Sequence, residues 1–192
     1  MFELLSQTFN ASLMAVTQLF LSAVVSTNPW FDQLDLQYHK LSQEIVCSTR
    51  LTESFTKTLD DVLMSGQSIT LHFRFELIAA STAKLIQQVE VVNGLRYDSE
   101  SEQFFLINSV DREVQRFHTI EDAKLSYISV RNLTIAATDT LDTDAEYYIR
   151  VLAFLDPIKL DNMGESVNLM LRWASVKPTI ISDRFKLAPR TS

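Results

Sequence analysis

The sequence of 192 residues contains only one cysteine, three glycines and three histidines, and each scarcity excludes a class of site. The single cysteine, Cys47, excludes a disulfide bond within the chain. Three glycines are too few and too widely spaced for the glycine-rich loops that hold nucleotide phosphates. The histidines and Cys47 fall in none of the spacings typical of zinc ligands. The sequence therefore predicts no cofactor and no metal.

Basic residues are also in the minority, with 17 Lys and Arg against 24 Asp and Glu, a formal charge of −7. An acidic chain of this kind argues against nucleic-acid binding, which requires a basic surface to displace phosphate counterions. The hydrophobic fraction of 46% and the charged fraction of 21% are those of an ordinary globular protein. We expect one β-rich domain over residues 27–192, preceded by a distinct segment, residues 1–26.

Residues 1–26 carry a single charge, Glu3, and the first basic residue is Lys40. Residues 13–25 are mostly apolar and have the length of the hydrophobic region of a signal peptide. The basic residues that normally precede such a region are absent, so the segment has two interpretations. It is either a signal or membrane anchor whose true start lies upstream, or an amphipathic helix packed on the domain. Apolar residues at helical spacing support the second: Leu5, Phe9, Leu13, Val16 and Phe20.

Alternation of apolar and polar residues predicts most of the remaining structure as strands. The clearest strand is residues 69–77, which follow a predicted helix at residues 55–63. We expect Thr52 or Thr56 to cap that helix and Gly66 to end it in the left-handed conformation. The other predicted strands are residues 34–39, 45–51, 84–97, 103–107, 113–118, 147–155, 166–175 and 179–187.

A second helix is predicted from Thr119, because Asp122 follows three residues later as in a capping box. The resulting order is β-β-α-β-β-β-β-α-β-β-β. This order predicts an α+β fold of mostly antiparallel β-structure, sandwich-like, with two helices plus the N-terminal apolar helix.

The run FTKTLDDVLMSGQSITLHFRFEL, residues 55–77, resembles the signature of an uncharacterised bacterial family, domain of unknown function 4390. The segments LRYDSESEQFFLINS, TIEDA and DTDAEYYIRVLAFLD are similar to further family segments in the same order. The resemblance covers roughly residues 51–187. The chain departs from the family at residues 182–185, where Ser-Asp-Arg-Phe replaces the usual Ser/Thr-Asp-Trp-Tyr.

The resemblance implies a mostly β protein of the bacterial cell envelope, exported or anchored in the membrane. Genes of the family often lie near the gene for a sensor histidine kinase, so the resemblance suggests such a kinase as a partner. The family is uncharacterised, so the resemblance does not suggest any particular activity.

The acidic run at residues 139–146 comes closest to a metal site, through Asp142, Asp144 and Glu146. Acidic residues at alternate positions are typical of calcium loops. However, Tyr147 stands where the sharp-turn glycine of such a loop belongs, and Ala153 where its bidentate glutamate belongs. A solvated loop before a strand explains the run better.

Cys47 with His39 or His72 would be the pair to consider for nucleophilic catalysis. Cys47 lies on the apolar side of an alternating strand, which favours a buried core cysteine. His72 points away from the apolar side of its strand, so we expect it at the surface or paired with Glu76.

Two pairs of adjacent aromatic residues, Phe104–Phe105 and Tyr147–Tyr148, interrupt the strand alternation. One ring of each pair must lie on the face opposite to its neighbour. Such a ring lies either under a helix or in an exposed patch, and an exposed patch would mark a surface for a partner.

These observations favour a non-enzymatic protein of the cell envelope, periplasmic or attached to the outer side of the cytoplasmic membrane. It would bind a protein or a ligand, with membrane association through residues 1–26. One alternative is a hydrolase acting through acidic residues, or a metal-binding domain. Another is a cytoplasmic structural or dimerisation domain whose first helix packs in the core.

Overall fold

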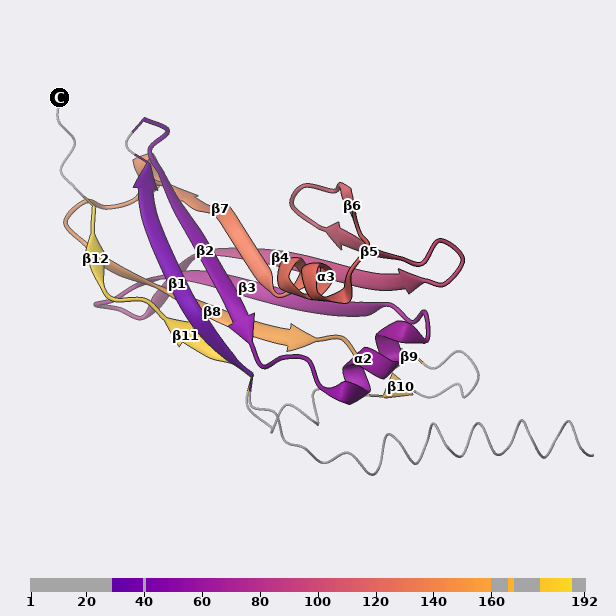
Figure 1. Ribbon diagram of the computed structural model, residues 1–192. Helices are drawn as coiled ribbons and strands as arrows, with labels where there is room; N and C mark the ends of the chain where they lie inside the picture. The colour runs from indigo at the N-terminus through magenta and orange to yellow at the C-terminus, as the bar shows by residue number, and fades with distance from the viewer. Residues whose placement is uncertain (1–28, 40, 160–165, 168–176, 188–192) are drawn as a thin grey trace, which may run out of the picture.

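The computed structural model describes residues 29–39, 41–159, 166–167 and 177–187 (Figure 1). The segment 1–26 lies outside the described residues, as does most of the predicted strand 166–175 with Trp173. Most of the described chain forms antiparallel β-structure, which confirms the predicted fold class.

Three strands form the smaller of the two main sheets, in the order β1-β2-β7. They are β1 (Trp30–His39), β2 (Glu44–Thr52) and β7 (Ser129–Ala137). The alternation in β2 follows the prediction, since Ile45, Cys47 and Leu51 are buried. Figure 1 shows this sheet crossing one face of the larger sheet.

The larger sheet has the order β11-β8-β3-β4-β5-β6, and a short strand, β12, also pairs with β8. Its strands are β3 (Ile69–Ala79), β4 (Lys84–Asp98), β5 (Gln103–Asn108), β6 (Val114–Phe117), β8 (Glu146–Leu155), β11 (Thr179–Ile181) and β12 (Phe185–Lys186). A separate two-stranded hairpin comprises β9 (Ile158–Lys159) and β10 (Ser166–Val167).

The hydrophobic core lies between the two sheets, and β3 is its central strand. The inward side chains of β3 are buried, as the period-two pattern predicts: Ile69, Leu71, Phe73, Phe75 and Leu77. The ring centroid of Phe73 is 6.3 Å from that of Phe31 on β1, so these two rings join the sheets directly. The fold is therefore a sandwich-like α+β architecture with a shared core.

Helix α2 (Lys57–Met64) joins the two sheets and ends as the sequence predicts. Of the two predicted caps, Thr56 is the one used, and its Oγ1 accepts a hydrogen bond from the Leu59 N–H at 3.2 Å. Gly66 has a φ of +85° and its N–H donates to the Leu63 carbonyl at 3.0 Å. Only glycine adopts this conformation without strain, so Gly66 allows the chain to turn directly into β3.

Helix α3 (Ile120–Tyr127) begins at the predicted cap. The Thr119 hydroxyl accepts from the Asp122 N–H at 3.2 Å and donates to the Asp122 carboxylate at 2.7 Å. An ion pair of 2.5 Å between Lys124 and Asp60 connects α3 to α2. Both helices lie toward the same end of the larger sheet (Figure 1).

The predicted strand order is wrong in three places. It lacks the short strand β9, and it has one strand over residues 179–187 where the structure has β11 and β12. It also contains no strand between the second helix and residues 147–155. The structure places β7 there, followed by the short 3-10 turn η1 (Thr138–Thr140). Val130 and Leu133 are buried, but Arg131 and Asn132 between them are both exposed. Asn132 has a φ of 50°, and the register with β2 shifts, which is a β-bulge. The bulge breaks the alternation on which the prediction depended.

Candidate functional site

A groove of about 540 Å³ lies where β7 faces α3 and the β4–β5–β6 part of the larger sheet. Six consecutive residues of β7, residues 129–134, form one wall. The lining side chains with the least exposure are apolar, namely Leu106, Val130 and Leu133. The remaining lining residues are Val89, Asn108, Val110, Asp111, Gln115 and Ser126. The groove thus combines an apolar interior with a polar rim.

A buried amide network supports two walls of this groove. The fully buried Asn93 side chain donates to the Tyr127 carbonyl at 2.7 Å, at the end of α3. Its Oδ1 accepts from Asn108 Nδ2 at 2.7 Å. Asn108 Oδ1 in turn accepts from the Val110 N–H at 2.7 Å, in the turn between β5 and β6. Asn93 therefore fixes the end of α3 relative to this turn.

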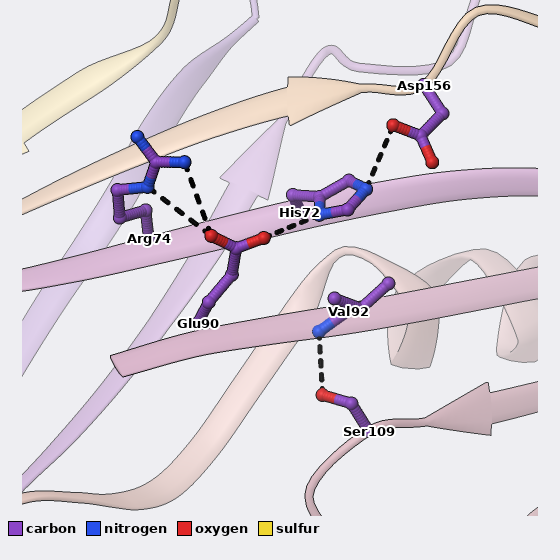
Figure 2. A network of polar contacts seen from close by, with 6 residues as sticks. All are labelled: His72, Arg74, Glu90, Val92, Ser109 and Asp156. Carbon is purple, nitrogen blue, oxygen red and sulfur yellow. Dashed lines mark hydrogen bonds and ion pairs between the residues drawn. The ribbon is translucent and has the colours of Figure 1, made fainter. Parts of the chain in front are cut away.

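The same turn is also tied to β4 through Ser109, as Figure 2 shows. The Ser109 Oγ accepts from the Val92 N–H at 2.9 Å, and the Ser109 N–H donates to the Val92 carbonyl at 2.9 Å. The groove wall formed by the turn is thus held by hydrogen bonds from both sides.

The wall formed by β7 offers backbone groups as well as side chains. β7 is the outer strand of its sheet, and within the described chain no strand pairs with its other edge. An edge strand presents a row of backbone N–H and C=O groups for pairing with another chain. Together with the apolar interior, this edge can bind an extended segment of a partner protein.

A second polar cluster surrounds His72, on the face of the larger sheet that points away from the core (Figure 2). His72 Nδ1 is 2.9 Å from Glu90 Oε1, and His72 Nε2 is 3.0 Å from Asp156 Oδ1. Arg74 donates to Glu90 Oε2 at 3.3 and 3.4 Å. The His72 ring also stacks on Phe154, with a centroid distance of 4.6 Å and an angle of 7°.

The predicted environment of His72 is therefore wrong, since its side chain is only 15% exposed and does not pair with Glu76. Glu76 instead accepts from Arg150 at 2.6 Å. Residues 72 and 76 are about 13 Å apart along one strand, whereas neighbouring strands are about 4.8 Å apart. Pairing across strands therefore prevails over pairing along β3.

The His72 cluster has the geometry of a structural network. Glu90 and Asp156 approach different nitrogens of the ring, so the three groups do not converge on one point (Figure 2). Among the residues that the structure describes, no three His, Cys, Asp or Glu side chains are placed to hold a metal ion together. The cluster ties β3 to β4 and to the end of β8.

Replacing Glu90 with glutamine is expected to lower the free energy of unfolding at pH 7 by about 0.5 kcal/mol, as for a partly exposed ion pair. The hydrogen bond from His72, aided by Arg74, holds the pKa of Glu90 below its usual value of 4.5. Because the pKa of Glu90 is lower in the folded state than in the unfolded state, its interactions stabilise the protein fully at a pH above the unfolded-state pKa. This stabilisation is lost as the pH falls through the folded-state pKa. Urea unfolding of both proteins should show a smaller difference at pH 3 than at pH 7. A difference that grows on acidification would contradict this.

Cys47 is completely buried, which confirms that it is a core cysteine. Burial, with a smaller contribution from Asp35, raises the pKa of its thiol from 9.0 to about 12. His39 is exposed, and its ring lies 3.4 Å from the Gln37 side chain, so it does not activate Cys47. The structure thus brings none of the predicted nucleophile and base candidates together.

We expect a thiol-reactive dye to label Cys47 in the native protein at pH 8 at least a thousandfold more slowly than in denaturant. The raised pKa alone reduces the thiolate fraction by about a thousandfold, and burial adds a steric barrier. Labelling kinetics measured by absorbance in buffer and in 6 M guanidinium (roughly full unfolding) provide the test. Complete native labelling within minutes would show that Cys47 is accessible.

The acidic run forms a turn before β8. Asp142 Oδ1 accepts from the Asp144 N–H at 2.9 Å, and the Tyr147 hydroxyl donates to the Asp142 carbonyl at 3.1 Å. Glu146 is exposed at the first position of β8. The structure therefore brings Asp142 and Asp144 into one turn and leaves Glu146 outside it.

The two aromatic pairs behave as predicted. Phe104 is buried in the core, while Phe105 lies on the opposite face, with the Arg116 guanidinium 5.8 Å from its ring centroid. Tyr147 is buried and Tyr148 is half-buried on the outer side of β8. The outward ring of Phe105 is thus near a positive charge.

A family model, described as a domain of unknown function (DUF4390), matches residues 31–164. No curated protein and no solved structure matches the chain. In the described part of the chain, no helix has the length and apolar character needed to cross a membrane. Because the match covers more than half of the sequence, the chain belongs to the DUF4390 family.

Proposed function

We propose that this member of the DUF4390 family is a non-enzymatic protein of the cell envelope that binds a partner protein in the groove along β7. It would act in the periplasm or on the outer side of the cytoplasmic membrane. The apolar segment of residues 1–26 supports this location, as does the envelope location that the family resemblance implies. A sensor histidine kinase is the first partner to test, because family genes often lie near one.

The observation that carries this proposal is the combination of a strand edge with an apolar interior in one groove. The six residues of β7 that line it extend over about 20 Å. This length suits an extended segment of a partner, whose backbone would pair with β7 while alternate side chains enter the groove. The apolar residues Leu106, Val130 and Leu133 would bury that segment's apolar side chains.

The polar lining favours binding over acid–base or nucleophilic chemistry. Within the described residues the lining contains no histidine or cysteine, and Asp111 is its single carboxylate. The Ser129 hydroxyl donates to the Leu125 carbonyl at 2.7 Å and has no base beside it in the lining. These groups can provide hydrogen bonds to a partner, but they do not form a nucleophile and base.

Photo-crosslinking in cells of the native host tests the proposal. A photoreactive amino acid replaces Gln115 or Thr134, which lie on opposite walls of the groove, in the full-length chain. The control position is Ile86, an exposed residue of β4 outside the groove. We expect the same crosslinked protein from both groove positions and not from Ile86. No crosslink from either groove position, or an identical product from all three, would contradict the proposal.

Cell fractionation tests the proposed location separately. We expect the native protein, with its true start, in the periplasmic or membrane fraction. Recovery of the protein in the cytoplasmic fraction would contradict the envelope location while leaving the groove proposal to the crosslinking experiment.

A further inference from the structure

The ring of His72 meets a carboxylate at each of its two nitrogens (Figure 2). Nδ1 lies 2.9 Å from Glu90 Oε1, and Nε2 lies 3.0 Å from Asp156 Oδ1. A neutral imidazole has one N–H and one bare nitrogen, so it can donate to only one of these carboxylates. The protonated ring has an N–H on both nitrogens. Both contacts are therefore favourable at the same time only while the ring carries its second proton.

The contact with Glu90 is the more firmly held of the two. It has the geometry of a hydrogen bond, and Arg74 donates to the same carboxylate. Within the part of the chain that the structure describes, the buried Nε2 has no hydrogen-bond partner, and Asp156 approaches it only as an ion pair. The Asp156 side chain is 52% exposed and that of Glu90 33%, so Asp156 loses less when it turns to water. A neutral ring should therefore keep its proton on Nδ1, toward Glu90.

Two cations also lie close to His72, and both lie over the ring on which it stacks. The Arg74 guanidinium is 5.3 Å and the Lys177 ammonium 4.9 Å from the centroid of Phe154. These cations oppose a further positive charge at this place, while the two carboxylates favour it. The carboxylates contact the imidazole directly, so they are the groups that a change in its charge affects most.

We propose that His72 is a proton-operated clamp. The protonated ring holds Glu90 of β4 and Asp156 at the end of β8 together, and loss of one proton releases the Asp156 side chain while Glu90 stays bound. Histidine is the side chain that ordinarily changes charge between about pH 5 and 8, which is the range in which the clamp would operate. The Asp156 N–H donates to the Thr70 carbonyl at 3.0 Å, so the backbone at this point is held independently of the ring.

The clamp acts where the chain leaves the larger sheet. Asp156 directly follows β8, and β9 begins two residues later at Ile158. Burial, and to a smaller degree the charge of Asp156, raises the pKa of Tyr127 on α3 well above its usual value, so this carboxylate also acts on a second element. The clamp is independent of the proposed partner binding, because neither carboxylate nor His72 lines the groove.

Nuclear magnetic resonance of the full-length protein, with ¹⁵N in its histidine rings, tests the first part of this proposal. The nitrogen chemical shifts show which ring nitrogens carry a proton, and the spectrum of His72→Gln assigns the His72 signals. We expect both His72 nitrogens to be protonated at about pH 5 and Nδ1 alone at about pH 8. His39 and His118 are exposed and serve as controls, which should average between the two neutral forms at the higher pH.

Urea unfolding of Asp156→Asn tests whether the second proton holds Asp156. The control is Asp183→Asn, which removes the same charge from an exposed position between β11 and β12. Relative to this control, Asp156→Asn should raise the unfolding equilibrium constant roughly threefold at about pH 5, as for a partly exposed ion pair. The two variants should not differ at about pH 8, because the stabilisation is present while the ring is protonated and is lost with its proton.

Three results would overturn the proposal. One is a His72 ring with the same protonation at both pH values, and another is a neutral ring that carries its proton on Nε2. The third is an effect of Asp156→Asn that is equal at both pH values or larger at the higher one. The ring spectra are recorded on the wild-type chain, so they decide the first two outcomes even if a variant does not fold.

Discussion

Phe73→Ala should lower the free energy of unfolding by about 3–5 kcal/mol, the range for truncating a buried phenylalanine. Phe73 is completely buried at the centre of β3, between Val91 of β4 and Ala153 of β8. Its ring also meets Phe31 of the opposite sheet, at 6.3 Å between centroids. Removal of the ring leaves a cavity between the sheets that neighbouring strands, fixed by their hydrogen bonds, cannot close.

Urea unfolding monitored by circular dichroism measures this loss, and the adjacent residue provides a control. Arg74→Ala changes the outward face of the same strand, where the side chain is 36% exposed. This substitution should lower the free energy of unfolding by less than about 1 kcal/mol, as expected for a partly exposed ion pair. Equal losses for the two variants would show that Phe73 is not between two packed sheets.

Asn93→Ala should have the second large effect and lower the free energy of unfolding by about 2–3 kcal/mol. The substitution removes two hydrogen bonds of 2.7 Å, to the Tyr127 carbonyl and from the Asn108 amide. The Tyr127 carbonyl would remain in the interior without this donor, and an unsatisfied buried acceptor costs more than the lost bond itself. The effect is therefore larger than that expected from the volume of the side chain.

Hydrogen exchange distinguishes this mechanism from general destabilisation. The Val110 N–H donates to the Asn108 side chain, which is itself hydrogen-bonded to Asn93. In Asn93→Ala, exchange of the Val110 amide should therefore accelerate more than exchange of the amides in β3. Phe73→Ala, as a control, should accelerate exchange in β3 and at Val110 to a similar extent. No selective change at Val110 would show that Asn93 does not support the groove.

Strict alternation made most of the fold predictable. The inward residues of β3 and the capped ends of α2 and α3 follow rules that act within a few residues, so the sequence alone indicates them. The strand β7 was not predicted, because the bulge at Arg131 and Asn132 places the buried Val130 and Leu133 three positions apart instead of two. An asparagine within an apolar run is the signal that could have indicated the bulge.

The groove could not be predicted, because its walls come together only through the order of strands in space. Asn108 and Arg131 line the same groove although neither shows a local pattern, and the pairing of Asn93 with Tyr127 joins residues 34 positions apart. The partners of His72 were missed for the same reason, since Glu90 and Asp156 lie on other segments. Sequence periodicity gives the face on which a side chain lies, but it does not identify the strand beside it.

The central claim is that a partner protein binds in the groove. Its most direct test is the affinity of this chain for the protein that crosslinking captures there. Isothermal titration would compare Gln115→Trp, at the cross-strand partner of the groove residue Leu106, with Gln88→Trp on the exposed outer side of β4. If the partner binds in the groove along β7, Gln115→Trp should weaken binding at least about tenfold, or about 1.4 kcal/mol, while Gln88→Trp leaves it unchanged. Equal affinities for the two variants would contradict binding in the groove.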